Sequence, residues 1–580
     1  MMYDFSTPIN RRGTACIKWD ITEPFGTTEP VTPFWIADMD FATLPEVTQA
    51  LHARCDHPIF GYSIAPEGAV EAVCGWYARR HGFDFRPEDV LCGIGVVTMI
   101  RYMLDAMTAP GDRVIVMSPV YDAFYKVVTG AGRELYDVPL KCEGGQYCMD
   151  LDGVEEALKA GARCVLFCNP HNPVGRIWTR EELTELAALL ARYDAWIISD
   201  EVHGDIELSG PRYTPMGCIE SAKDRCAVCT AISKTFNLAG LHQSCIVIQN
   251  AEMREKVDGL LHSAWIMGPN VMAYHAMKAA YTHGDQWLDE LRAYLLDNAK
   301  YVVDELAARA PEIRTNVPQG GYLMWVDLRM LGLTSAEASA SLVANSRVGI
   351  SSGRNYGPQC EGFMRLNIGC PRSTLKVAVD ALVKLAESRR VEHRPVATIT
   401  MADGREMKLE LYPELAPNTV ASFIHLARLG CFDRHGIERI EPGYVVDVSF
   451  TAFGREECKY LIANEAPAAG GVNPLPAAPG YVCMGGYPEG IAGGEFFFPL
   501  AESPRLDGKY PVFGRITEGM ELLREWAQAE LAGTFYPMEP PVPTTKPATP
   551  IVMESVTVDT FGVDYPAPVT YPAPIKPPAW

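Results

Sequence analysis

The chain has 580 residues, a formal net charge of −21, and 48% hydrophobic and 21% charged residues. This length allows several domains, and the composition is ordinary for a globular protein. The acidic balance argues against a surface for nucleic acid or an anionic membrane, so we expect no partner of either kind. No apolar run approaches membrane-spanning length and no signal peptide is visible, which predicts a cytoplasmic protein.

The cysteines point to the same compartment. There are 17 of them, an odd number, and they are scattered along the chain. We expect reduced thiols in the core rather than a disulfide framework. Cys226 and Cys229 have the spacing of a redox or zinc motif. However, no second Cys/His pair lies nearby, so core packing is favoured and no metal site is expected.

The opening region contains two carboxylates in an apolar setting. Asp38 and Asp40 flank Met39, just before a helical pattern that runs to Arg54. One interpretation is a loop that caps this helix. The other is a loop that contributes to a functional site, and the pattern alone does not decide between them.

Short apolar strands then alternate with helices. We predict strands at 90–95, 113–117, 162–168, 196–199, 227–232 and 244–248, and helices at 96–109 and 180–193. Strands that are apolar throughout, with helices between most of them, indicate a largely parallel sheet covered on both faces. In such sheets ligands bind at the carboxyl ends of the strands. The fold class is therefore α/β.

Chemically distinctive residues follow these predicted strands. Gly93-Ile-Gly95 before a helix can bind a phosphate through backbone N–H groups. Tyr121 is placed to stack on a flat ring or to pack in the core. Asn172, in a loop with two Asn-Pro turns, can donate to a phenolate oxygen. Asp200 ends a strand, where a carboxylate can keep a ring nitrogen protonated. Lys234 can form a Schiff base with an aldehyde or be a solvated loop lysine.

The spacing of Asn172, Asp200 and Lys234 resembles that of the fold-type I pyridoxal 5′-phosphate (PLP) enzymes, the aspartate-aminotransferase superfamily. Four stretches look more closely like its cystathionine β-lyase-like C–S lyases: Trp35-Ile-Ala-Asp-Met-Asp-Phe41, Ile59-Phe-Gly-Tyr62, Ser118-Pro-Val-Tyr-Asp-Ala-Phe-Tyr125 and Ser233-Lys-Thr-Phe-Asn-Leu-Ala-Gly240. The resemblance covers roughly residues 1–388. It implies a PLP-dependent transferase fold over 1–390, with a large domain at about 50–284 and a small α+β domain from 1–49 and 285–390.

The resemblance also implies a role for each site residue. Lys234 would be the Schiff-base lysine, and Tyr121 would stack on the cofactor ring. Other cofactor contacts would come from Gly95, Val96, Val97, Asn172, Asp200, His203, Ser233 and, from a neighbouring subunit, Tyr62. Arg365 would clamp the substrate α-carboxylate, with Asp38 as a second substrate-binding residue. The reach of Tyr62 implies a homodimer. His242 stands where aminotransferases keep a phosphate-binding arginine, which departs from the family pattern.

The implied reaction is α,β-elimination from an L-cysteine thioether such as cystathionine, which yields a thiol, pyruvate and ammonia. Lys234 would remove the α-proton as general base. An aminotransferase uses the same cofactor residues and is the alternative. The stretch Ala37-Asp-Met-Asp-Phe41 favours the lyase.

A charged segment ending at Pro395 reads as a linker, placed at 391–395. The region 396–563 then looks like a cyclophilin-type peptidyl-prolyl isomerase domain, an eight-stranded barrel. The resemblance rests on three stretches: a hairpin at 397–412, Ala416-Pro-Asn-Thr-Val-Ala-Ser-Phe423, and Leu506-Asp-Gly-Lys-Tyr-Pro-Val-Phe-Gly-Arg-Ile-Thr-Glu-Gly519. A proline-rich tail at 564–580 is expected to be extended and to have no core.

The active-site strand of this second region departs from the cyclophilin pattern. The expected catalytic Arg439 is retained, and Phe497 and Tyr510 could line a proline pocket. Asp447 and Glu495 stand where cyclophilins have glutamines, so two neutral donors become acceptors beside the arginine. Three readings stay open: an isomerase, a module that binds proline-containing peptides, and a purely structural barrel.

Overall fold

The computed structural model describes residues 2–143, 145–391, 393–448, 455–487, 490–532, 535–536, 542–543 and 545–572. The chain splits into two compact units. Unit 1 comprises Met1–Asp327 and Ser335–Leu385, and unit 2 comprises Leu328–Thr334 and Ala386–Trp580. No helix in these described ranges is long and apolar enough to cross a membrane.

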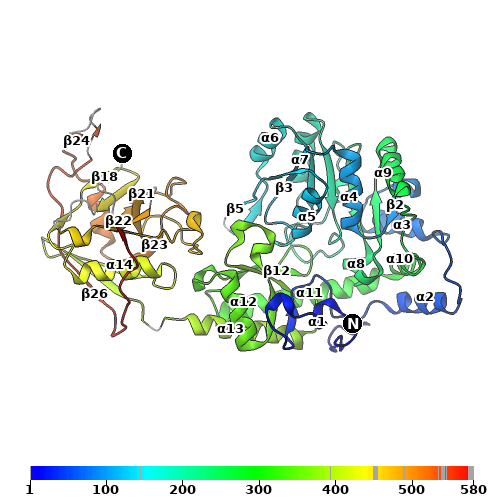
Figure 1. Ribbon diagram of the computed structural model, residues 1–580, viewed down its shortest axis with the longest axis horizontal. Coiled ribbons are helices and arrows are strands. Elements are labelled where there is room, and N and C mark those ends of the chain that lie inside the picture. The colour runs from blue at the N-terminus through cyan, green and yellow to red at the C-terminus, as the bar shows by residue number, and fades with distance from the viewer. Residues whose placement is uncertain are drawn as a thin grey trace. The chain divides into compact units, whose positions relative to one another are not determined.

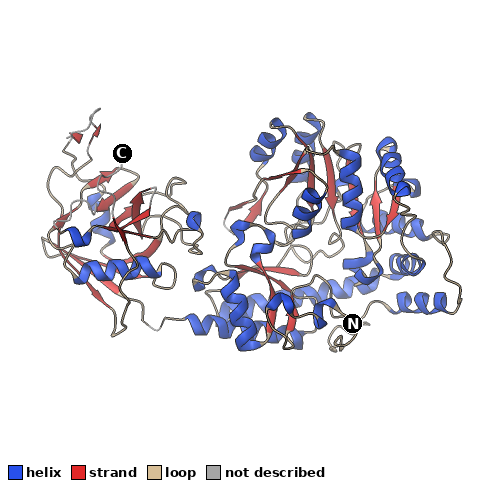
Figure 2. Ribbon diagram, viewed as in Figure 1, coloured by secondary structure: helices blue, strands red, loops and turns tan. Residues whose placement is uncertain are grey.

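Unit 1 contains a seven-stranded sheet in the order β2-β10-β9-β8-β7-β3-β4. Two of its strands, β2 and β3, are labelled in Figure 1. The strands are β2 (Val90–Gly93), β3 (Arg113–Val116), β4 (Glu134–Asp137), β7 (Ala162–Cys168), β8 (Trp196–Asp200), β9 (Cys226–Thr230) and β10 (Ser244–Val247). Only β10 runs antiparallel to its neighbours. Helices surround the sheet (Figure 2). The predicted fold, mostly parallel and covered by helices, is confirmed.

Local sequence signals explain where the flanking helices start. Helix α7 (Arg180–Arg192) begins with a capping box: Glu182 N donates to Thr179 Oγ1 (3.2 Å) and Thr179 N donates to the Glu182 carboxylate (2.7 Å). Helix α4 (Val96–Met107) begins after Gly95, whose φ of 109° lies in a region that favours glycine. That turn exposes the first N–H groups of α4.

A second, five-stranded sheet forms the smaller part of unit 1. Its order is β1-β13-β14-β12-β11, from β1 (Thr32–Phe34), β13 (Val348–Ser352), β14 (Phe363–Asn367), β12 (Leu323–Asp327) and β11 (Arg314–Thr315). The first of these strands pairs in parallel with β13, so the chain's opening region joins its later part. Helices α11 (Asp285–Arg309), α12 (Ser335–Ser346) and α13 (Arg372–Arg389) belong to the same region.

Unit 2 is built on one antiparallel sheet. Nine strands follow in the order β17-β26-β15-β16-β23-β21-β22-β19-β18, and β20 (Tyr460–Ile462) and β27 (Tyr571–Pro572) join beside β22. The nine are β15 (Val396–Met401), β16 (Glu406–Leu411), β17 (His435–Gly436), β18 (Arg439–Glu441), β19 (Val445–Val448), β21 (Tyr481–Tyr487), β22 (Gly490–Pro499), β23 (Val512–Glu518) and β26 (Val552–Asp559). The cyclophilin-like fold is confirmed. Instead of eight strands, the described sheet has eleven, several of them only two or three residues long.

Part of the proline-rich tail is paired with unit 2. β27 forms an antiparallel pair with β20. Asn418, in helix α14 (Pro417–Arg428), exchanges two hydrogen bonds with the backbone of Val569, at 3.0 and 2.8 Å. The tail was expected to have no core, and these residues add only an edge strand. Residues 573–580 lie outside the described ranges.

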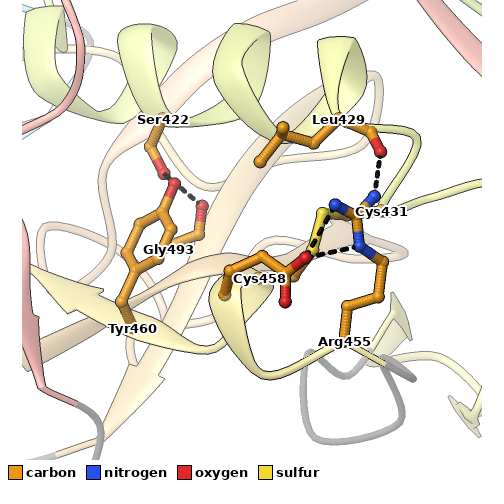
Figure 3. Close-up of a disulfide and its surroundings, with 8 residues drawn as sticks. Ser422, Leu429, Cys431, Arg455, Cys458, Tyr460 and Gly493 are labelled. Atoms are coloured by element: carbon orange, nitrogen blue, oxygen red, sulfur yellow. Dashed lines mark hydrogen bonds and ion pairs between the residues drawn. A yellow bond between two sulfur atoms is a disulfide. The ribbon is translucent and has the colours of Figure 1, made fainter.

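One pair of cysteines is bonded, which corrects the expectation of reduced thiols throughout. Cys431, just after α14, forms a disulfide with Cys458, 27 residues later (Figure 3). Arg455 donates from Nη1 to the Leu429 carbonyl beside the bond, and Tyr460 OH lies 2.9 Å from Ser422 Oγ on α14 (Figure 3). The other fifteen cysteines form no disulfide.

The disulfide generates a stability prediction. Replacing Cys431 and Cys458 with alanine should lower the free energy of unfolding of unit 2 by about 3 kcal/mol, because the cross-link restricts the unfolded chain. The melting transition of unit 2 should fall by roughly 10 °C in scanning calorimetry. Reductant should produce the same shift in the unaltered protein and none in the double variant. An unaltered transition in reductant would contradict the prediction.

Candidate functional site

Unit 1 contains a cavity of about 560 Å³ at the carboxyl ends of its parallel strands. Ten of the site residues expected from the sequence line it: Gly95, Val96, Val97, Tyr121, Asn172, Asp200, His203, Ser233, Lys234 and Arg365. His242 also lines it. The structure therefore brings residues from five strand ends and from β14 into one place.

Two expected site residues lie elsewhere. Tyr62 is fully exposed, in the segment between helices α2 (Pro45–Cys55) and α3 (Ala69–His81). Asp38 lines a neighbouring cavity of about 290 Å³, and its carboxylate pairs with Arg11 (2.9 Å) and Lys18 (3.5 Å). Asp38 is thus engaged by cations of this chain rather than directed at the larger cavity.

The amine of Lys234 is held by a backbone carbonyl. Its Nζ donates to Ala37 O at 2.7 Å. Removal from water, together with the charge of Arg365, lowers the pKa of Lys234 to about 8, although Asp38 and Asp200 oppose the shift. A substantial fraction of the amine is therefore neutral near pH 8 and able to act as a nucleophile.

Asp200 ends β8 and is 6% exposed. Burial raises its pKa to about 6, opposed by a hydrogen bond from Val202 N and by the charge of Lys234. The carboxyl is ionised at neutral pH, and a cationic group placed against it would stabilise that form further. This suits the protonated nitrogen of a heteroaromatic ring.

Two buried nitrogen atoms in the cavity wall have no hydrogen-bond partner among the residues that the structure describes. One is Arg365 Nε, although Arg365 also donates from Nη1 to Asn172 Oδ1 (3.1 Å) and from Nη2 to Trp35 O (2.6 Å). The other is Nδ1 of His203, a residue whose pKa is lowered to about 3 by burial, so the ring is neutral. Buried unpaired donors and acceptors are costly, and here they mark positions that a ligand can satisfy.

Several residues at this site escaped the sequence analysis. Tyr322 OH donates to Ala37 O at 2.9 Å, so one carbonyl serves both Tyr322 and Lys234. The guanidinium of Arg365 lies 4.9 Å from the ring centre of Tyr356. Asn237 bonds the backbone of Met39, and because it lies within the motif around Lys234, it could have been found. No local sequence motif indicated a role for Tyr322 or Tyr356.

In unit 2 the expected isomerase residues lie together. Arg439 on β18 pairs across the strands with Asp447 on β19, which is opposite Phe497 on β22. The rings of Phe497 and Tyr510 meet edge to face at 5.3 Å. Arg439 donates from Nη1 to Asp447 (2.9 Å) and from Nε to Glu441 (3.2 Å). Its guanidinium is thus shared between two carboxylates.

Glu495 completes this group in unit 2. It is 6% exposed, and its Oε2 has no hydrogen-bond partner among the described residues. Burial, and then the charge of Asp447, raise the pKa of Glu495 to about 8, while burial raises the pKa of Asp447 to about 6 against the pull of Arg439. At neutral pH Glu495 is largely protonated.

Residues 30–382 match the family model for aminotransferase class I and II. The chain belongs to this family. It is 39% identical to the cystathionine β-lyase PatB of Bacillus subtilis over 64% of the chain and 97% of that protein, and 35% identical to the protein MalY of Escherichia coli over 67% and 100%. Among solved structures, cystalysin of Treponema denticola, which contains PLP, aligns with a TM-score of 0.65 and 29% identity over 67% of this chain and 100% of its own.

Unit 2 has its own match. Residues 396–558 fit the family model for cyclophilin-type peptidyl-prolyl cis-trans isomerases. The relatives of unit 1 are almost fully covered by two-thirds of this chain, so they leave no room for a counterpart of unit 2.

The donor set of the larger cavity fits PLP. Lys234 would offer an amine to its aldehyde, Asp200 a carboxylate to its ring nitrogen, and the start of α4 N–H groups to its phosphate. The unpartnered atoms of Arg365 and His203 leave further positions for the cofactor and an amino acid. Among the described residues no group of His, Cys, Asp and Glu is arranged to hold a metal ion.

The lowered pKa of Lys234 generates a pH prediction. The rate at which the apoprotein forms a borohydride-reducible link with PLP should rise about tenfold between pH 7 and 9 and then level off, because only the neutral amine reacts. A lysine of ordinary pKa would give a rise of about 100-fold over that interval without levelling. Lys234→Ala should form no stoichiometric link, and a link in that variant would disprove the assignment.

Proposed function

We propose that unit 1 is a PLP-dependent carbon–sulfur β-lyase that cleaves L-cysteine thioethers to a thiol, pyruvate and ammonia. The observation that carries this proposal is the convergence of Lys234, Asp200 and Arg365 on one cavity in a chain whose relatives include cystathionine β-lyases. A cystathionine-type thioether is the substrate class, and the aminotransferase is the alternative within the same family.

Each residue has a task in this reaction. When bound, PLP withdraws electrons from the α-carbon of the amino acid. Arg365, whose Nε has no partner among the described residues, would hold the α-carboxylate, and Asp200 would keep the ring nitrogen of PLP protonated. Lys234, whose lowered pKa suits proton transfer near neutral pH, takes the α-proton. The thiolate then leaves from the β-carbon, and water releases pyruvate and ammonia.

The remaining site residues support these steps. Tyr121 would stack on the ring of PLP, and Asn172 and His203 would bind near its phenolate oxygen. Gly95, Val96, Val97 and Ser233 would hold the phosphate, and His242 lines the same cavity. The phosphate would thus be held mainly by neutral N–H and hydroxyl groups.

A homodimer follows from one exposed segment. Ile59 (67%), Phe60 (59%), Tyr62 and Ile64 (88%) are exposed in succession between α2 and α3. Such a run of large apolar side chains favours burial against another chain. A second copy is the occupant we propose, with Tyr62 directed at the partner's phosphate site.

The domain boundary and the location are further proposals. We place the PLP region at 1–390 and the second domain at 396–563, which is supported by the start of unit 2 at Ala386. Unit 2 also includes Leu328–Thr334, which the sequence did not indicate. A cytoplasmic location is supported by the fifteen cysteines that form no disulfide, against one disulfide in unit 2.

The test of function is incubation with cystathionine in the absence of any keto acid. The lyase should release pyruvate and free thiol in equal amounts, and Arg365→Ala should lower kcat/KM by about 30- to 1000-fold, because a charge-assisted contact is lost. Lys126→Ala, at an exposed lysine outside the cavity lining, is the matched control. Amino-group transfer to the cofactor without release of thiol would identify an aminotransferase instead.

For unit 2 we propose a module that binds proline-containing peptides with little isomerase activity. Phe497 and Tyr510 provide an apolar surface, while Asp447 and Glu441 occupy the guanidinium of Arg439. An arginine neutralised in this way polarises a substrate amide poorly.

This proposal predicts the effect of restoring neutral amides. Asp447→Gln together with Glu495→Gln should raise proline isomerisation in a standard peptide assay by about tenfold, equivalent to 1.4 kcal/mol. Glu438→Gln, at a carboxylate paired with Lys546 (2.9 Å), should leave the rate unchanged. Equal rates in the unaltered protein and the double variant would show that the carboxylates do not limit activity.

A further inference from the structure

A buried carboxylate accepts a hydrogen bond from the residue that follows Lys234 in the chain. Asp205, in the turn after β8, is 3% exposed. Its Oδ1 accepts from Trp76 Nε1 (2.8 Å) and lies 2.7 Å from His81 Nε2, while its Oδ2 accepts from Thr235 Oγ1 (2.8 Å). Burial alone would raise the pKa of Asp205, but the bonds from His81, Thr235 and Trp76 outweigh it and lower the pKa. Asp205 is therefore an ionised acceptor.

Thr235 is the residue next to Lys234. Both lie in α8 (Ile232–Thr235), where consecutive side chains point about 100° apart. Lys234 faces the cavity, and Thr235, which is 1% exposed, faces Asp205. The direction of the lysine and the anchoring of the threonine are therefore coupled through one short stretch of backbone.

Helix α8 is too short to hold its own geometry. It is a single turn, and such a helix gains little stability from its backbone bonds. Its shape must come from side chains around it: Gln243 Oε1 accepts from Ile232 N (3.1 Å), and Asp205 accepts from Thr235. Of these anchors, the bond to Asp205 is the one that involves a charge and adjoins Lys234.

We propose that Asp205 and Thr235 are positioning residues that fix the Lys234 amine for proton transfer, with Trp76 and His81 holding Asp205 in place. The same segment carries Asp200, five residues earlier, so the turn after β8 would align Asp200, the proposed partner of the ring nitrogen of PLP, with Lys234. The inference rests on the proposed function. Neither residue lines the cavity, so neither touches the substrate.

The test compares two substitutions of Thr235 in the full-length protein loaded with PLP. Thr235→Val removes the hydroxyl and keeps the shape, and should lower kcat about 10- to 100-fold with KM little changed, since misplacement of a reacting group has effects of this size. Thr235→Ser restores the hydroxyl and should recover activity to within a few-fold. The pH midpoint for the reducible link between PLP and Lys234 should move by about 0.5 unit or more in Thr235→Val only.

Thr419→Val is the matched control, because Thr419 is a buried threonine whose Oγ1 donates to the Glu465 carboxylate at 2.7 Å in unit 2. It should change neither kcat nor the pH midpoint. If Thr235→Val fails to fold, Asp205→Asn should show the same loss of kcat, and normal activity there would overturn the inference. Equal impairment in Thr235→Ser and Thr235→Val would overturn it as well.

The two proposals fail in different ways. If the unaltered protein releases no pyruvate but the pH midpoint still moves in Thr235→Val, the lyase assignment is wrong and the positioning role stands. If the unaltered protein is an active lyase and Thr235→Val matches it in kcat and pH midpoint, the positioning role is wrong and the lyase assignment stands.

Discussion

The active-site cavity depends on a cluster of four charges, two of them buried, that anchors the loop at residues 35–41. Lys18, 1% exposed, donates to Asp40 Oδ2 (2.8 Å), and Arg11 donates to Asp40 Oδ1 (2.7 Å) and to Asp38 (2.9 Å). Two cations and two carboxylates balance, so no net charge is buried. Removing Lys18 or Asp40 would leave its buried partner without compensation, at a cost of about 3–5 kcal/mol. The cluster therefore holds the loop in a single position.

What the anchored loop presents to the cavity is a row of backbone carbonyls. Trp35 O accepts from Arg365, Ala37 O from Lys234, and both Ile36 O and Asp38 O from Asn367. The cations of the site are thus oriented by neutral acceptors instead of carboxylates. Orientation by a dipole leaves the charge of Arg365 available to a substrate carboxylate, and it does not raise the pKa of Lys234 as a carboxylate partner would.

How much of the site the sequence could predict depends on how far apart along the chain the interacting residues are. Asp200 and Lys234 come at the ends of apolar strands. Because parallel strands place their carboxyl ends at one edge of the sheet, the sequence pattern predicts that these two residues lie close together, and both line the cavity. The partner of Asp205 is Thr235, 30 residues away, and that of Asp38 is Arg11, 27 residues away. The hydrophobic periodicity of a sequence does not indicate which polar side chains will pair in this way. The same holds for the bond between Cys431 and Cys458, which only folding brings together.

The two arginines of the proposed sites show how strongly hydrogen-bond partners affect the charge that an arginine can offer to a ligand. Arg365 is 4% exposed, is bonded to a side-chain amide and a backbone carbonyl, and keeps its full charge toward the cavity. Arg439 shares its donors between Asp447 and Glu441, so its field at a bound peptide is largely cancelled. Retention of an arginine at a family's catalytic position is therefore weak evidence of activity by itself. Its partners must be known, and for Arg439 they are two carboxylates, which argue against efficient catalysis.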